Sequence, residues 1–300
     1  NMANFESHSQ INGSNGHPPK ASFGDVQLPN THLHYVTCGE GEPLIIVPAT
    51  VSLIEQWMPL AQFMGQRYKS YFFEMPGHGK STPYPFKFNS SYVPQTVEAF
   101  ADAMGIEKFT LMGFSFGGLL AMRTLEHLEH RINKVILLSP LLSQETLKYQ
   151  NPKRWIIKTG MNLLKNSKAQ QTAHQIMNSN YFEKPLMYAV SKITNVEQSI
   201  LKSKNALKIP ISTLDVFAHT VGEIFEMEYK NGGPPSEIPC FFGMSIYDDM
   251  IDFGMTESIV KKHFKNLTMQ KFFHPYHQPP EPPTFDWLVN GFDEFLSIIK

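Results

Sequence analysis

The sequence predicts an α/β fold in which helices cover both faces of a mainly parallel sheet. Strand-like apolar runs alternate with segments of helical periodicity between residues 44 and 138, and the same alternation returns between residues 238 and 299. Residues 143–237 contain no strand-like run. A chain of 300 residues, 42% of them hydrophobic, can bury one large core and still carry an insertion. We therefore expect one α/β domain with a helical insertion.

The first part of the chain predicts a disordered segment followed by antiparallel strands. Residues 1–22 mix Asn, Ser, Gly, His and Pro without periodicity, so we expect this segment to be disordered. β-prone runs over residues 26–36 and 44–47 flank a turn at residues 38–43, and we expect the domain to open with antiparallel strands there. The elements expected next are a helix over residues 54–68, a strand over 69–73, a helix over 97–104, a strand that ends at a Gly-x-Ser-x-Gly motif, and a strand over 135–138.

The insertion is expected to form a helical lid over residues 143–236, which divides the α/β core into residues 23–142 and 237–300. Its first part, through Lys208, is rich in Lys and Arg, and its latter part is acidic. We interpret both parts as solvated outer faces rather than as a funnel for an anionic substrate. Five apolar residues of the lid either line a substrate pocket or form the core of the lid: Met161, Met177, Met187, Phe217 and Phe225.

After the insertion, the alternation of strand and helix resumes. We expect a strand over residues 238–244, a helix over 256–264, a strand over 267–273 and a closing helix over 284–299. Thr284 is expected to cap the N-terminus of the closing helix, because its hydroxyl can accept a hydrogen bond from a free backbone N–H group.

The Gly-x-Ser-x-Gly motif at residues 113–117 is the clearest functional signal. An apolar β-prone run ends abruptly in this motif and continues with helical periodicity, which is the strand–turn–helix context that gives the motif meaning. Ser115 is expected at the apex of a strained turn, and Gly113 and Gly117 allow the chain to approach itself closely there. The N-terminus of the following helix offers free N–H groups to developing negative charge. Ser115 is therefore a candidate nucleophile.

Several motifs resemble those of the α/β-hydrolase superfamily. Residues 74–81 read Glu-Met-Pro-Gly-His-Gly-Lys-Ser and resemble its acidic-x-x-Gly-x-Gly-x-Ser loop, residues 103–106 resemble its approach to the nucleophile strand, and residues 113–118 resemble its nucleophile elbow. The resemblance covers residues 26–142 and 237–300, and the helical insertion stands where that fold carries its lid. It implies an α/β-hydrolase fold with catalytic residues in the order nucleophile, acid, histidine.

The resemblance implies Asp248 as the acid. The superfamily commonly carries this residue in Gly-x-x-Asp-x-x-Val after the strand that follows the lid, and here Ser245 replaces the Gly. The role needs a carboxylate that accepts a hydrogen bond from the Nδ1–H group of the base. Asp249 is the alternative acid.

Two neighbouring histidines, His274 and His277, compete for the role of base. The superfamily pattern of His-x-Pro, followed by an acidic residue and a helix, fits His277, so we prefer His277 and keep His274 as the alternative. His78 belongs to the tight loop at residues 74–81 and is expected to be structural or solvated.

The resemblance also implies two N–H donors for an oxyanion hole. Phe116 directly follows the nucleophile and supplies one. The other comes from the loop after the strand at residues 44–47, where the superfamily usually has His-Gly-x and this chain has Pro48-Ala49-Thr50, so Thr50 takes the donor position. Because Ala49 cannot take a positive φ as cheaply as Gly, we expect a differently shaped loop. The Thr50 hydroxyl either helps to hold the oxyanion or bonds within the loop.

These residues predict a serine hydrolase for an ester-like bond of a small, partly apolar substrate. Ser115 would attack the carbonyl, His277 would transfer the protons, and Asp248 would orient His277, without any metal or organic cofactor. A Ser at the elbow disfavours haloalkane dehalogenation and epoxide opening, which use an Asp nucleophile in this superfamily. The alternatives are C–C bond hydrolysis, acyl transfer or perhydrolysis on the same residues, and a ligand-binding protein with little turnover.

Composition indicates a small-molecule partner and a cytoplasmic enzyme. A net charge of −1 gives no reason to expect nucleic acid or an anionic membrane as the partner. No apolar run reaches the roughly 18 residues of a membrane helix, and the N-terminus lacks the basic-then-apolar order of a secretion signal. Cys38 and Cys240 lie in apolar strand-like runs and are expected to be buried free thiols.

Overall fold

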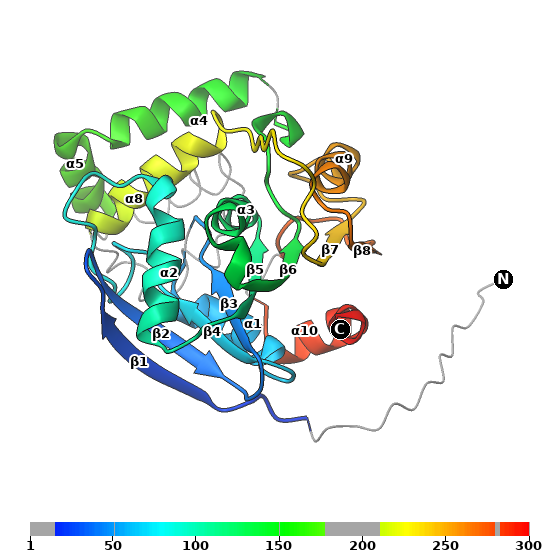
Figure 1. Ribbon diagram of the computed structural model, residues 1–300. Coiled ribbons are helices and arrows are strands. Elements are labelled where there is room, and N and C mark those ends of the chain that lie inside the picture. The colour runs from blue at the N-terminus through cyan, green and yellow to red at the C-terminus, as the bar shows by residue number, and fades with distance from the viewer. Residues whose placement is uncertain (1–15, 51, 150, 178–210, 280–282, 300) are drawn as a thin grey trace.

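The computed structural model describes residues 16–50, 52–149, 151–177, 211–279 and 283–299 of the chain. A central eight-stranded sheet dominates the fold (Figure 1). Its strands are β1 (Ala21–Gln27), β2 (His32–Cys38), β3 (Pro43–Val47), β4 (Lys69–Phe73), β5 (Phe109–Phe114), β6 (Ile132–Leu138), β7 (Cys240–Ser245) and β8 (Leu267–Phe272).

The sheet is mixed at one edge and parallel elsewhere. Its strand order is β1-β2-β4-β3-β5-β6-β7-β8, and β2 pairs antiparallel with both β1 and β4. All the neighbouring pairs from β4–β3 to β7–β8 are parallel. The predicted mainly parallel sheet is therefore confirmed.

Two expectations about the first strands are wrong. Residues 26–36 form two strands rather than one, because a turn closed by the Leu28 N–H and the Thr31 carbonyl separates β1 from β2. Residues 38–43 do not join an antiparallel pair, since β3 runs parallel to both of its neighbours. In addition, β1 begins at Ala21, inside the segment that was expected to be disordered.

Helices cover both faces of the sheet, as predicted (Figure 1). α2, α3 and α9 pack on one face, and α1 and α10 pack on the other. The Thr284 side chain caps α10 by accepting a hydrogen bond from the Trp287 N–H at 3.2 Å, which confirms the predicted N-cap. The helices are α1 (Ile54–Met64), α2 (Val93–Ala103), α3 (Phe116–Leu128), α4 (Asn151–Leu164), α5 (Ser167–Met177), α8 (Ile211–Ile224), α9 (Phe253–His263) and α10 (Phe285–Ile298), with 3-10 turns η1 (Ser90–Tyr92), η2 (Glu129–Arg131) and η3 (Gln144–Thr146).

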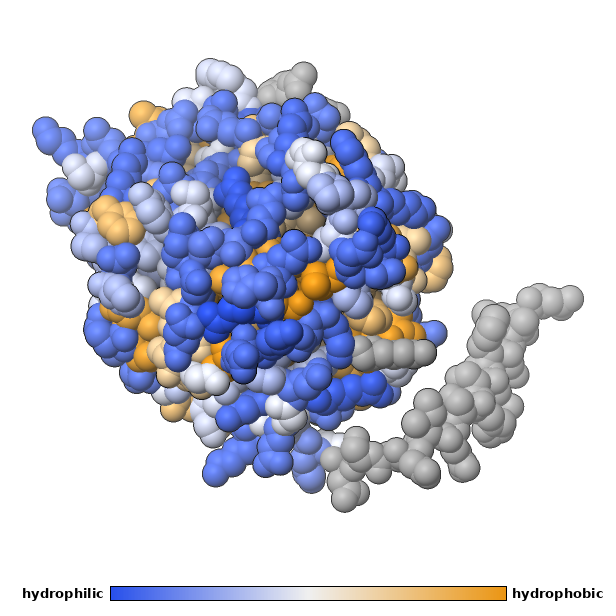
Figure 2. Space-filling view, viewed as in Figure 1, coloured by the Kyte–Doolittle hydropathy of each residue, from blue (hydrophilic) through white to orange (hydrophobic). Residues whose placement is uncertain are grey.

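The core is divided by the sheet into two layers. Along β3, Leu44 and Ile46 contribute to the layer under α1 and α10, whereas Ile45 and Val47 contribute to the layer under α2 and α3. This alternation follows from the two-residue period of a strand whose two faces are both covered. The surface is mainly hydrophilic in the view of Figure 2, with smaller apolar patches between the polar side chains.

The two cysteines are free and buried, as predicted. Burial raises the pKa of the Cys38 thiol to about 11 and holds the pKa of the Cys240 thiol well above its ordinary value. Both thiols are therefore protonated at neutral pH, which makes them poor nucleophiles.

Helices α4, α5 and α8 lie between β6 and β7 in the sequence and pack on one another beside the sheet (Figure 1). They occupy the region where a helical lid was expected, but the division into a core of residues 23–142 and 237–300 and a lid of residues 143–236 stays a prediction. Within the described part of the chain, no helix combines the length and the apolar character required to span a bilayer.

Candidate active site

Ser115 occupies a strained turn between β5 and α3. Its φ of 54° and ψ of −125° lie in a region that favours Gly. A Cβ atom on Gly113 would overlap the backbone of Gly117, and one on Gly118 would lie 2.5 Å from the Pro140 side chain. These glycines therefore meet a steric demand, because a larger residue at Gly113 would push β5 and α3 apart and one at Gly118 would push α3 away from the segment that follows β6.

The structure brings Ser115, His277 and Asp248 together beyond the carboxyl ends of β5, β8 and β7. His277 Nε2 lies 2.8 Å from Ser115 Oγ, and His277 Nδ1 lies 2.7 Å from Asp248 Oδ2. Since an ionised carboxylate only accepts hydrogen bonds, the imidazole Nδ1 carries the proton. Nε2 of the neutral ring is then free to accept the Ser115 hydroxyl proton. All three residues are buried, with relative exposures of 8% for Ser115, 7% for His277 and 0% for Asp248.

The Asp248 carboxylate is held in its ionised form. Burial by itself raises the pKa of this carboxyl, but the hydrogen bond from His277, the charge of its protonated ring and two backbone N–H groups outweigh burial and keep the pKa below its ordinary value. Those N–H groups belong to Met250 and Ile251 and lie 2.9 and 2.8 Å from Asp248 Oδ1. In addition, Lys148 Nζ donates to the backbone carbonyl of Asp248 at 2.6 Å.

The alternative acid and base occupy supporting positions. Asp249 Oδ1 accepts a hydrogen bond from the backbone N–H of His277 at 2.7 Å, so it fixes the loop that carries this histidine. The His274 ring stacks on Tyr276 with centroids 4.8 Å apart, and its carbonyl accepts a hydrogen bond from Ser245 Oγ at 2.6 Å. Burial lowers the pKa of His274. Both residues therefore help to shape the loop that presents His277.

Sequence reasoning missed two contacts of this group. The Phe114 ring stacks on the His277 imidazole with centroids 5.2 Å apart and an interplanar angle of 18°. Lys148 lies 100 positions before the Asp248 carbonyl that it contacts. Phe114 occupies a variable position of its motif and Lys148 lies in no motif, so neither carried a signal in the sequence.

The two candidate oxyanion donors lie on either side of Ser115. Phe116 is the first residue of α3, where a helix has no internal partner for its N–H group. Thr50 follows β3 and lines the same cavity as Ser115. A Cβ atom on Gly117 would lie 2.9 Å from the Val47 carbonyl, so the elbow packs directly against the end of β3. Within the described residues, neither the Phe116 N–H nor the Thr50 N–H donates to another protein group.

A cavity of about 290 Å³ opens beside Ser115 and His277. Most of its lining is aromatic or aliphatic, and the lining residues of the described chain include neither Lys nor Arg. Of the five apolar lid residues, Phe217 and Phe225 line this cavity and also pack in or against the main core, and Met161 packs against that core without being among the described lining residues. The Met177 side chain and Met187 lie outside the described residues.

A Ser, His and Asp so arranged on the loops of a largely parallel sheet define a hydrolase of the α/β class. The family described as alpha/beta hydrolase fold matches residues 42–210, which is more than half of the 300 residues. The chain belongs to this family.

Known proteins similar to the chain are also hydrolases. N-formylmaleamate deformylase of Pseudomonas putida is 27% identical over 122 residues, which are 40% of this chain and 46% of that protein. A 2-hydroxy-6-oxo-6-phenylhexa-2,4-dienoate hydrolase of Burkholderia cepacia is 25% identical over 247 residues, which are 77% of this chain and 84% of that protein. The solved structure of an alpha/beta fold family hydrolase from Bacillus anthracis matches with a TM-score of 0.63 and 19% identity over 92% of this chain and 98% of that one. The chain spans less than half of the deformylase, and these relatives do not share one substrate.

Proposed function

We propose that the protein is a serine esterase in which Ser115 is the nucleophile, His277 the base and Asp248 the residue that orients the base. The distance of 2.8 Å between Ser115 Oγ and His277 Nε2 carries this proposal, because it allows the proton transfer that activates a serine. Asp248 supports it by fixing the Nδ1–H tautomer and by stabilising the imidazolium that forms during the reaction. The N–H groups of Phe116 and Thr50 would bind the oxyanion.

The proposed reaction proceeds through an acyl-enzyme. Ser115 Oγ attacks the ester carbonyl carbon while its proton moves to His277 Nε2, and the N–H donors stabilise the negative charge on the carbonyl oxygen. The bond to the alcohol oxygen then breaks, and the alcohol leaves with the proton from His277. A water molecule next gives a proton to His277 and attacks the acyl group. Release of the acid returns the proton to Ser115.

The cavity favours a small, neutral and largely apolar substrate. A carboxylate on the substrate would lose its hydration without gaining a cation, because the lining within the described chain contains no Lys or Arg. Asp249 also lies in this lining, and its carboxylate would repel a carboxylate on the substrate. Val221 and Ile224 of α8 line the same cavity, so we assign the inserted helices of residues 143–236 as a lid that contacts the substrate.

Hydrolysis of a C–C bond is the second candidate. The Burkholderia cepacia relative is named for a substrate whose 6-oxo group lies between carbon substituents, so cleavage there would break a C–C bond. That substrate also carries a carboxylate, for which the lining of the described cavity offers no cationic partner. We therefore place ester hydrolysis first.

A fluorophosphonate probe and a substrate panel test the proposal. We expect the probe to label Ser115 of the wild type, and we expect Ser115→Ala to abolish labelling and lower kcat by about 10³-fold or more. The 4-nitrophenyl ester of butyrate should have a kcat/KM at least about tenfold above that of the matching hemisuccinate, since the latter buries an unpaired charge. Full activity of Ser115→Ala would reject the nucleophile, and faster turnover of a phenyl-bearing oxodienoate than of any ester would replace ester hydrolysis with C–C cleavage.

A further inference from the structure

The oxyanion loop, residues 48–50, is held in place by a second loop. His78 Nε2 lies 3.2 Å from the carbonyl oxygen of Thr50. Two residues further along, Ser52 Oγ accepts a hydrogen bond from the Met75 N–H at 3.0 Å. Both contacts come from residues 74–82, which we name the support loop. The position of Thr50 therefore depends on a segment that is distant in the sequence.

His78 is a neutral hydrogen-bond donor in this contact. Its side chain is fully buried, and burial lowers its pKa to about 4 against the opposing effect of the Thr50 and Pro76 carbonyls. A carbonyl oxygen can only accept, so the proton of the neutral ring lies on Nε2. Nδ1 is buried and has no hydrogen-bond partner within the described residues. An unpaired buried nitrogen costs free energy, and an apolar side chain at this position would avoid that cost. The hydrogen bond to the Thr50 carbonyl is therefore the specific contribution of His78.

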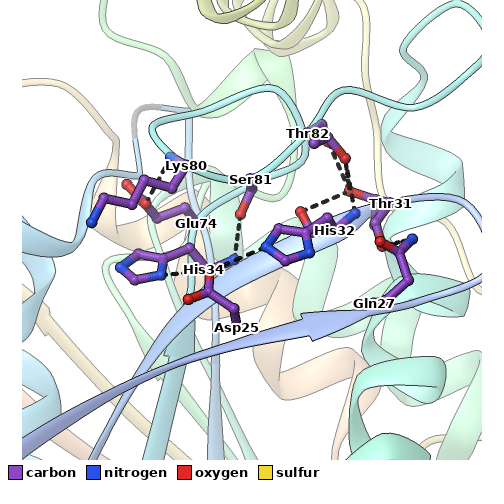
Figure 3. A network of polar contacts seen from close by, with 9 residues as sticks. All are labelled: Asp25, Gln27, Thr31, His32, His34, Glu74, Lys80, Ser81 and Thr82. Carbon is purple, nitrogen blue, oxygen red and sulfur yellow. Dashed lines mark hydrogen bonds and ion pairs between the residues drawn. The ribbon is translucent and has the colours of Figure 1, made fainter.

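The support loop is tied to β2 on one side, as Figure 3 shows. Ser81 Oγ accepts a hydrogen bond from the His34 N–H at 3.0 Å, and the Glu74 N–H donates to the His34 carbonyl at 2.9 Å. Glu74 Oε1 also accepts from the Lys80 N–H at 3.1 Å, which closes the loop on itself. A Cβ atom on Gly79 would overlap the Glu74 carboxyl group, so the loop is tightly packed. Its position is therefore fixed relative to the sheet.

The other side of the support loop contacts α8. The Gly77 carbonyl accepts hydrogen bonds from Ser212 Oγ at 3.1 Å and from Thr213 Oγ1 at 2.7 Å. Gly77 has a φ of 89°, and a Cβ atom there would lie 2.8 Å from Val216 Cγ2. A glycine is thus required both by the backbone and by the close approach of α8. Gly77 directly precedes His78 in the chain, so the contact with α8 is adjacent to His78.

We propose that His78 is a positioning residue for the oxyanion hole and that α8 sets the position of His78 through Gly77. This inference rests on the proposed function, in which the Thr50 N–H is an oxyanion donor. The chain of contacts runs from Thr213 through Gly77 and His78 to Thr50, and each link is a hydrogen bond or a peptide neighbour. The position of α8 against the support loop therefore determines the alignment of the Thr50 N–H in the oxyanion hole. The lid thus acts on the chemistry as well as on access to the cavity.

Substitution of His78 tests the first part. In His78→Leu we expect kcat per titrated active site to fall by about tenfold while KM changes less than about twofold, because a displaced oxyanion donor acts mainly on the transition state. The Kd of a boronic acid that forms a tetrahedral adduct with Ser115 should rise by the same factor. His78→Gln places an amide N–H near the same carbonyl and should restore most of kcat. A merely structural role would lower Tm and leave kcat per active site unchanged, and that result would overturn the inference.

A double-mutant cycle tests the link to α8. Ser212→Ala with Thr213→Val should lower kcat about threefold in the wild-type background and have almost no further effect in His78→Leu, because the two changes act through one route. Independent, multiplicative losses would reject the route through Gly77. If His78→Leu does not fold, the comparison uses His78→Gln and His78→Asn, since the shorter amide of Asn does not reach the Thr50 carbonyl; equal kcat values would then reject the role of His78. Failure of the wild type to react with the fluorophosphonate would instead reject the proposed function itself.

Discussion

The two sides of Ser115 are fixed in different ways. On the elbow side, Gly113, Gly117 and Gly118 lie within three residues of the nucleophile and let β5 meet α3 in a strained turn. On the oxyanion-loop side, the loop carries Ala49 where its superfamily usually has Gly, and His78 holds it from outside. The first geometry is local in the sequence, whereas the second exists only once distant segments have packed. Mutations on the two sides should therefore lower kcat to different extents.

The largest effect is expected at His277, the proposed base, whose Nε2 contacts Ser115 Oγ. His277→Ala should lower kcat by about 10³-fold or more and abolish fluorophosphonate labelling, because Ser115 loses the group that accepts its proton. His274→Ala is the matched control, since that ring packs on Tyr276, and it should keep most of the labelling. The opposite pattern in kinetics and labelling would transfer the role of base to His274.

A smaller loss is expected when the oxyanion loop loses its donor. Thr50→Pro removes one N–H group, and we expect kcat to fall by about 10² to 10³-fold with the fold retained, as checked by circular dichroism and ester kinetics. Thr50→Val keeps the N–H and removes only the hydroxyl, so it serves as the control. A folded and fully active Thr50→Pro enzyme would show that this loop does not supply the donor.

The pH dependence of stability reports on His78, the buried residue that holds the oxyanion loop. The pKa of His78 is about 4 in the folded protein and near its usual 6.5 in the unfolded chain, so between these values the unfolded chain binds the extra proton. Stability is therefore lost as the pH falls from 6.5 towards 4. Between pH 7 and pH 5 we expect the free energy of unfolding of the wild type to drop about 2 kcal/mol more than that of His78→Gln.

Urea unfolding at the two pH values measures this difference. The lowered pKa of Asp248 acts only below about pH 4 and is common to both proteins, so it does not contribute to the comparison. Equal losses in the wild type and in His78→Gln would mean that His78 is not buried as a neutral residue.

The sequence predicted much of the elbow side because its signals are short-range. Strand and helix periodicity around residues 113–118 predicted the turn, and the motifs around Asp248 and His277 predicted residues that the structure brings to hydrogen-bonding distance of one another and of Ser115. Their catalytic roles stay predictions. The alternation of strand and helix likewise predicted the parallel sheet, since each parallel pair needs a crossover between its strands.

The remaining features could not be predicted because they depend on long-range packing. His78 was expected to be structural or solvated, and only the approach of the support loop to Thr50 shows what its buried ring contacts. Lys148 donates to the carbonyl of Asp248, which lies 100 positions further along the chain. The break between β1 and β2, in contrast, had a local signal that was overlooked, since the turn at residues 28–31 carries Pro29 and Asn30, both typical of turns.

The backbone conformation of Ser115 sets the stability of the protein against its proposed chemistry. At a φ of 54°, Gly in place of Ser would stabilise the protein by about 1 kcal/mol, because Gly adopts this conformation without strain. Catalysis and thermostability thus select for different residues at one position.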